Sequence, residues 1–361
     1  MKSKDGISAR YVLGGVLFAL ALLRLAAAPY ADQAAQLKFR SGVTPRRQAR
    51  PDRVWDPWGW RKLRSIALSG SLEGPVYPHI AADDSLVVYD APNYAVRRIS
   101  PAGVMRESIA IPAEVFLRTT VSLTDVAPAE DGAIIWGCNP NGNITGFDRA
   151  GRVLYTLPRT ARGMRLAVFR DRLIATQVGS EHLFGAYTKE GRTVAQFGEV
   201  LEEQPNSLVL TDGWLAADAS QQAFYYAPRY DGFLASYKIN GASMFLVQTI
   251  DALPLPTLGR RADGGVNYPT LLASVSYIAA RGDKLYVLVN RGGVVGEPSA
   301  EPTTLDTYSA RDGSYLSSSV MPGRYIGIAL GHGVGYTIGA AGVDIWALPL
   351  AAGSPGPGRV R

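Results

Sequence analysis

The stretch Leu86 to Gly103, LVVYDAPNYAVRRISPAG, decides the fold of this chain. It reads as an apolar strand, a polar loop, a second strand and a turn that ends in glycine. Short runs of β-branched and aromatic residues between Asp, Asn, Pro and Gly are typical of strands. Taken alone, this stretch predicts one hairpin.

The hairpin pattern recurs six times along the chain. Its first strands begin at Leu86, Ala133, Leu173, Ala223, Leu285 and Val334, so the intervals are 47, 40, 50, 62 and 49 residues. Its second strands carry paired apolar positions, which are Val96/Ile99, Ile144/Phe147, Phe184/Tyr187, Leu234/Tyr237, Leu305/Tyr308 and Val343/Trp346. Residues three apart point to opposite faces of a strand, so both faces are predicted to be buried. Repeats of 40–50 residues with about four strands each are typical of propeller blades.

Five of the six units continue into a polar turn that closes on glycine, and one more short strand follows. These turns end at Gly103, Gly151, Gly191, Gly241 and Gly313. Glycine adopts the left-handed conformation that such turns require without steric cost. A long β-sandwich with chance similarity between its parts is the alternative, and six in-phase copies argue against it.

The two ends of the repeat predict how the ring closes. The sixth unit, Tyr325 to Leu348, contains three strands, and an unpaired strand, Leu63 to Leu68, precedes the first unit. We expect this strand to complete the sixth blade, because closure removes exposed sheet edges. The predicted fold class is therefore all-β: a six-bladed β-propeller closed by an N-terminal strand and preceded by one hydrophobic N-terminal helix, which is an anchor or a signal.

The N-terminus has the outline of an export signal. A basic start precedes the apolar run Tyr11 to Leu23, and Arg24 and small residues up to Ala28 follow. Pro29 disfavours cleavage after Ala28, and the 18 residues from Tyr11 to Ala28 are just long enough to span a bilayer. We therefore expect a single-pass anchor in the inner membrane with the rest of the chain on the periplasmic side. A cleaved signal and a soluble periplasmic or secreted protein is the alternative.

Four segments are predicted: a signal-anchor or signal peptide (1–31), a basic stalk (32–62), the propeller (63–348) and a disordered tail (349–361). The stalk holds eight of the basic residues against three acidic ones, nearly the whole excess of a chain with net charge +6. It also holds Trp55, Trp58 and Trp60. These tryptophans are predicted either to cover the edge of the propeller or to bind membrane headgroups or a membrane partner. Nucleic acid is a poor partner for a segment outside the cytoplasm.

The six strand–loop–strand–turn units and the closing strand resemble the bacterial six-bladed β-propellers of the NHL/TolB-like superfamily. The resemblance covers about residues 63 to 348. It is specific for fold and weak for function, because such propellers include receptors, scaffolds, lactonases and lyases.

Motifs for catalysis are scarce. His79, His182 and His332 occupy different positions in their units, which disfavours a shared metal. A metal-dependent lactonase would draw on Asp and Asn side chains aimed into the channel, and the candidates are Asp83, Asp84, Asn139, Asn141 and Glu181. Their spacing singles out no set, and such residues commonly serve turns. The single cysteine, Cys138, excludes an internal disulfide. No cofactor and no metal site is predicted.

The loops between the two strands of each hairpin open on one face and form the predicted binding surface. Tyr94, Arg229, Tyr230 and Arg291 are its anchors, because Tyr and Arg are enriched at interfaces. We expect a non-catalytic binding or scaffold subunit of a cell-envelope complex, whose partner is a membrane or envelope protein complex. A lactonase-like hydrolase and a soluble periplasmic sugar or peptide binder are the alternatives.

Overall fold

The computed structural model describes residues 34–67, 77–90, 94–111, 125–129, 132–138, 144–157, 163–169, 172–177, 179–202, 212–218, 221–260, 266–267, 272–294, 302–339 and 342–349. The predicted N-terminal segment, with Tyr11, Leu23, Arg24 and Ala28, lies outside these residues, as do the tail after residue 349 and the lactonase candidates Asn139 and Asn141.

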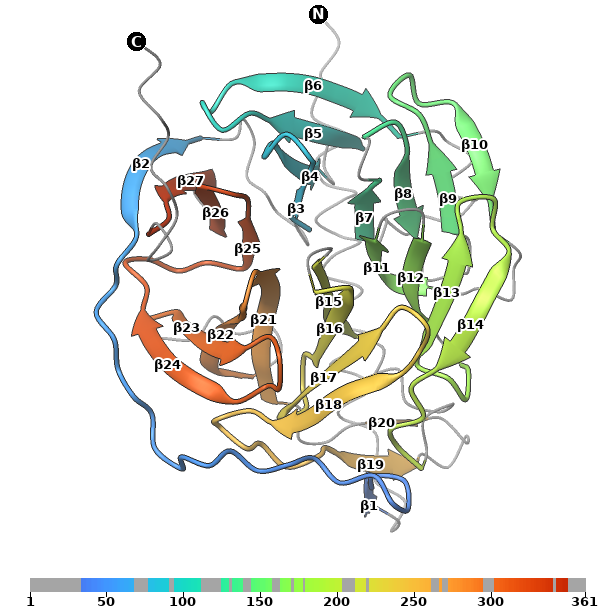
Figure 1. The fold of residues 1–361 in the computed structure, drawn as a ribbon, viewed down its shortest axis with the longest axis vertical. Helices are drawn as coiled ribbons and strands as arrows, with labels where there is room; N and C mark the ends of the chain where they lie inside the picture. The colour runs from blue at the N-terminus through green and yellow to red at the C-terminus, as the bar shows by residue number, and fades with distance from the viewer. Residues whose placement is uncertain are drawn as a thin grey trace, which may run out of the picture.

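Six four-stranded antiparallel sheets are arranged around a central axis (Figure 1), which confirms the predicted six-bladed propeller. The described residues contain no helix. Blade 1 comprises β3 (His79–Ile80), β4 (Leu86–Asp90), β5 (Ala95–Ile99) and β6 (Met105–Ala110). Blade 2 comprises β7 (Asp125–Pro128), β8 (Ile135–Cys138), β9 (Ile144–Phe147) and β10 (Val153–Thr156). Blade 3 comprises β11 (Gly163–Phe169), β12 (Arg172–Gln177), β13 (Phe184–Thr188) and β14 (Thr193–Phe197).

The other three blades complete the ring. Blade 4 comprises β15 (Gly213–Asp218), β16 (Ala223–Pro228), β17 (Phe233–Lys238) and β18 (Ser243–Gln248). Blade 5 comprises β21 (Leu272–Arg281), β22 (Lys284–Val294), β23 (Thr304–Ser309) and β24 (Tyr315–Val320). Blade 6 comprises β25 (Gly327–Leu330), β26 (Val334–Gly339), β27 (Gly342–Ala347) and, as its outer strand, β2 (Arg61–Ile66). A small additional sheet joins β1 (Ala34–Gln36), β19 (Thr257–Arg260) and β20 (Val266–Asn267).

The repeated hairpin of the sequence supplies the second and third strands of each blade. The second strands are buried on both faces, as the unbroken burial of β4 and β16 illustrates, and the third strands are mostly buried, as in β17. The closing turns after the third strands are left-handed at glycine, with φ of +77° at Gly103 and +86° at Gly241. A Cβ at Gly241 would lie 2.9 Å from the Phe197 ring, so the turn also packs closely against the preceding blade.

The ring has two faces, which follow from strand direction. Each inner strand (β3, β7, β11, β15, β21 and β25) begins at one face, which we call the loop face, and ends at the other, the turn face. Second strands end and third strands begin at the loop face. Outer strands also end there before the chain enters the next blade. Tyr94 and Arg229 to Asp231 therefore belong to the loop face.

Residues 37–60, which we call the strap, run along the outside of the ring from β1 to β2 (Figure 1). Its backbone pairs with outer strands at two places: Arg46 with Val247 of β18, and Trp55 with Ser318 of β24. Gln48 bridges the two blades, because its side-chain nitrogen donates to the carbonyls of Gln248 (2.7 Å) and Gly313 (3.1 Å). The strap therefore ties blade 4 to blade 5.

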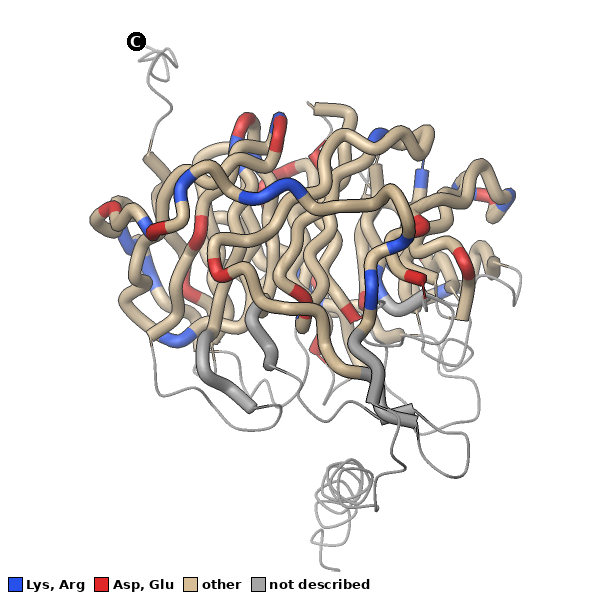
Figure 2. The backbone as a smooth tube through the Cα atoms, turned by 90° about the horizontal axis from the view of Figure 1, so that it is seen from below, with Lys and Arg blue, Asp and Glu red and all other residues tan. Residues whose placement is uncertain are grey.

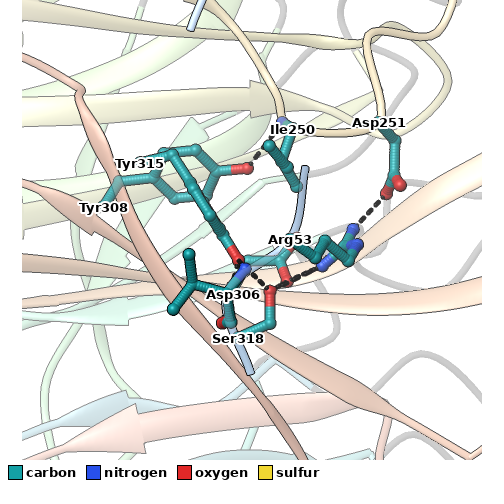
Figure 3. Close-up of polar contacts among 8 residues, drawn as sticks. Arg53, Ile250, Asp251, Asp306, Tyr308, Tyr315 and Ser318 are labelled. Carbon is teal, nitrogen blue, oxygen red and sulfur yellow. Dashed lines mark hydrogen bonds and ion pairs between the residues drawn. The ribbon is translucent and has the colours of Figure 1, made fainter. Parts of the chain in front are cut away.

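Arg53 is the largely buried anchor of the strap (Figure 3). Its guanidinium donates to the carboxylate of Asp306 on β23, to Ser318 Oγ on β24 (2.7 Å) and to Asp251 Oδ2 after β18 (2.7 Å). Burial acts to lower the pKa of Arg53, but Asp306 and Asp251 raise it above its ordinary value. The residue therefore remains a cation between two carboxylates from neighbouring blades.

Candidate functional site

Four side chains from four blades meet at the loop-face end of the central channel, and we call them the plug. They are Tyr77, Arg165, Trp214 and Tyr277, all under 9% exposed. The Arg165 guanidinium lies 4.6 Å from the Trp214 ring centroid and 5.0 Å from that of Tyr77. The ring centroids of Tyr277 and Trp214 lie 4.7 Å apart, and the Tyr277 hydroxyl donates a hydrogen bond of 2.9 Å to the carbonyl of Pro78. The plug therefore ties blades 1, 3, 4 and 5 together across the axis.

Carboxylates compensate the buried charge of the plug. Arg165 donates through Nε to the Gly213 carbonyl (2.9 Å) and through its terminal nitrogen to Asp212. Burial acts to lower the pKa of Arg165, yet nearby groups, including Asp212 and Asp125, raise it. A buried cation that lies close to two aromatic rings is strongly stabilised when it is paired in this way. The plug is thus a fixed charged centre.

The outer side of the plug carries two of the residues expected to bind a partner. Asp212 faces both Arg165 and Arg229, with 3.5 Å between its Oδ2 and the Arg229 guanidinium. Arg229 lies 5.5 Å from the Tyr230 ring centroid, and its side chain is 40% exposed. Burial, and then the Asp212 charge, raise the pKa of the Tyr230 hydroxyl to about 12. Arg229 and Tyr230 therefore form a partly exposed pair of a cation and an aromatic ring that contacts the plug through Asp212.

The inner side of the plug borders a cavity of about 140 Å³ in the channel, and Tyr277 is part of its wall. Most of the side chains in the wall are small or aliphatic, such as Ala216, Ala279 and Leu330. His79 contributes an imidazole, and its Nε2 lies 3.2 Å from Asp125 Oδ1. Asp125 is held in turn by the backbone N–H of Leu166 (2.8 Å). The cavity is thus lined by small and aliphatic residues and one oriented imidazole, and it exposes more polar than apolar surface.

The three histidines lie in separate places with separate carboxylates. His182 Nδ1 lies 2.6 Å from Glu199, and His332 Nδ1 lies 3.0 Å from Asp84. Within the described residues, no three His, Cys, Asp or Glu side chains are close enough to share a metal ion. The same residues contain no helix that is long and apolar enough to cross a membrane.

The structure places Tyr94 in another blade than Arg229 and Tyr230. Tyr94, in blade 1, is 43% exposed on the loop face and has a φ of +48°. Arg291 belongs to β22, and its side chain is not described.

The strap tryptophans lie away from the loop face. The ring centroid of Trp58 lies 4.8 Å from that of Trp60 and 5.3 Å from that of Trp346. The ring centroids of Trp60 and Tyr286 lie 5.9 Å apart. Both tryptophans contact the main hydrophobic core, whereas Trp55 remains 52% exposed. Trp346 lies next to the end of β27 and Tyr286 lies near the start of β22, so this aromatic group lies at the turn face.

Sequence reasoning missed the plug. One signal was available: Arg165 interrupts an apolar strand, and a charge in such a position is buried only when it is paired. Tyr77 and Trp214 gave no such signal, because aromatic residues are common throughout strands.

Comparison with known proteins supports the propeller fold and gives no evidence about function. No protein-family model matches this chain, and no curated protein matches it either. Among solved structures, it is similar to virginiamycin B lyase from Staphylococcus aureus, with a TM-score of 0.51 and 9% identity over 81% of this chain and 100% of the lyase chain. It also matches the β-propeller domain of Cps50 (Swd1) from Myceliophteria thermophila, with a TM-score of 0.46 and 10% identity over 81% and 100% of the two chains. At such low identity the first likeness shows the propeller fold alone.

Proposed function

We propose that this protein is a non-catalytic binding or scaffold subunit of a bacterial cell-envelope complex, related to the NHL/TolB-like propellers. Its N-terminal segment anchors it in the inner membrane, and its propeller stands on the periplasmic side. Its partner is a membrane or envelope protein complex that contacts the loop face.

The connection of Arg229 and Tyr230 to the buried plug through Asp212 is the observation that carries this proposal. Asp212 connects this pair directly to Arg165 and so to the aromatic rings of the plug. Interface hot spots are enriched in Arg and Tyr, and a preorganised pair loses little side-chain freedom on binding. A partner with a carboxylate or a main-chain carbonyl suits the exposed guanidinium.

The oriented imidazole of His79 favours a second candidate function in the channel. A hydrolase such as a metal-dependent lactonase, or a soluble binder of a small sugar or peptide, would place its ligand in the cavity beside His79. Metal analysis of the purified protein together with a lactone-hydrolysis screen separates the hydrolase from the scaffold. A stoichiometric divalent ion with turnover supports the hydrolase.

Replacing Arg229 and Tyr230 together by alanine is expected to abolish most co-purification of the partner from detergent-solubilised membranes. The loss of one hot-spot pair costs about 2 kcal/mol or more, which is roughly thirtyfold in affinity. The measurement is quantitative pull-down of tagged full-length protein followed by mass spectrometry.

Arg311→Ala is the matched control, because Arg311 is an equally charged, exposed residue on the β23–β24 turn at the turn face. Thermal unfolding of each variant establishes that the fold is intact. If the double variant captures the same proteins as the control in the same amounts, the proposed binding surface is wrong.

A further inference from the structure

The chain enters the propeller at the loop face. The Leu37 N–H donates to the Pro256 carbonyl (3.1 Å), and Phe39 forms a backbone bridge with Leu201. The Phe39 ring also packs 5.7 Å from Phe233, the first residue of β17. Leu201 and Pro256 follow the ends of the outer strands β14 and β18, and β17 begins at the loop face. All of these contacts therefore fix the start of the strap to that face.

Only a short tether separates this entry point from the apolar run. The predicted membrane-spanning segment ends at Ala28, and β1 begins at Ala34 and pairs with β19, so residues 29–33 are the whole connection. A fully extended chain covers at most about 3.5 Å per residue, so this tether spans roughly 20 Å. A six-residue strand alone measures roughly 20 Å. The tether is therefore too short to pass around the ring and bring the turn face to a bilayer.

We propose that the propeller is held with its loop face toward the bilayer, where that face rests on the lipid headgroup layer. This inference depends on the proposed membrane anchor and names the surface that the anchored domain meets. The partner is an anionic phospholipid surface, recognised by aromatic, aliphatic and cationic side chains together.

Side chains suited to that surface are exposed on the loop face in blades 1 and 6. Tyr94 is 43% exposed, and Ile326, next to the start of β25, is 41% exposed. Arg324 is exposed two residues earlier. Tyrosine favours the headgroup level of a bilayer, and a basic residue is attracted to anionic lipid. Blade 4, with Arg229 and Tyr230, can then bind a protein that lies in the same membrane.

The same geometry changes the role expected for the tryptophans. The strap begins at the loop face and reaches the turn face at Trp58 and Trp60, where both rings pack against the core. Figure 2 shows basic residues spaced along the strap as it passes around the molecule. An anchor at the loop face directs the tryptophans away from the bilayer. In this orientation the loop face contacts the membrane, and the Trp-rich part of the strap does not.

Single-cysteine labelling of the full-length protein in vesicles tests this orientation. The native cysteine, Cys138, is fully buried and is removed by Cys138→Ala. Tyr94→Cys and Ile326→Cys place an environment-sensitive fluorophore on the loop face, and Val104→Cys and Arg311→Cys place it at exposed positions on the turn face. The vesicles contain phosphatidylcholine and phosphatidylglycerol, with and without a headgroup-linked nitroxide quencher.

The expected result is loss of fluorescence from both loop-face labels and no loss from the two turn-face labels. Quenching of the turn-face labels instead overturns the orientation. If no label is quenched while the protein floats with the vesicles, the orientation is again wrong, although the anchor stands. Protein that fails to float shows that the anchor itself is wrong and removes the basis of the orientation with it.

Discussion

Replacing Arg53 by methionine is expected to lower the free energy of unfolding by about 3–5 kcal/mol, the usual cost of removing one partner from a buried ion pair. Asp306 is 1% exposed, and burial already raises the pKa of its carboxyl while Arg53 acts to lower it. Without Arg53, this carboxylate keeps Ser318 as a hydrogen-bond donor but loses its countercharge. Urea-induced unfolding near neutral pH, followed by tryptophan fluorescence, measures the change.

Two further variants make this result specific. Arg50→Met makes the same chemical change at an exposed strap position and is expected to alter stability by less than about 0.5 kcal/mol. Adding Asp306→Leu to Arg53→Met removes the unpaired carboxylate and is expected to restore much of the lost stability, as buried pairs replaced by apolar side chains commonly do. Equal stability of the Arg50 and Arg53 variants would mean that the ion pairs of Arg53 do not stabilise the folded protein.

The repeated hairpin was predictable because its information is local. The strands that begin at Leu86 and Leu285 are recognisable from their own composition, and the glycine turns are recognisable from the few residues around each glycine. The order of the blades follows from the repeat, since consecutive units must pack side by side to bury both faces.

Contacts that join distant segments carry no such local pattern. Arg53 and Asp306 are 253 residues apart, and Arg165 and Asp212 are 47 apart in different blades. In the sequence, Arg53 is one of many basic residues in a polar segment, so its charge predicts solvent exposure. Its burial depends on how the strap crosses the gap between blades 4 and 5. The same limitation hid the plug, which exists only because inner strands converge at the axis.

Asp231 is a residue whose importance emerged only with the structure. It follows Tyr230 in the loop between β16 and β17 and is fully buried. Neither oxygen of its carboxyl group has a hydrogen-bond partner in the part of the chain that the structure describes. Burial raises the pKa of Asp231 to about 7, because a charged carboxylate without water or a donor is costly. The loop that presents Arg229 and Tyr230 therefore contains a destabilising group near neutral pH.

Replacing Asp231 by asparagine is expected to stabilise the protein, and increasingly so as the pH rises. With a pKa of about 7 when folded and about 3.9 when unfolded, the folded chain holds an extra proton between those values, so stability falls as pH increases across that interval. The penalty is absent below about pH 4 and reaches about 4 kcal/mol above about pH 7.

The measurement is the difference in unfolding free energy between Asp231→Asn and the natural protein, by urea unfolding at about pH 5 and about pH 8. Titratable groups that both proteins share contribute equally to the two unfolding free energies and so cancel in the difference. The difference should grow by about 2–3 kcal/mol from about pH 5 to about pH 8. Asp283→Asn, at an exposed turn, should give a difference that stays near zero at both pH values. A pH-independent difference for Asp231→Asn would mean that this carboxyl is ionised in the folded state throughout, and that the loop supplies it with a donor or with water.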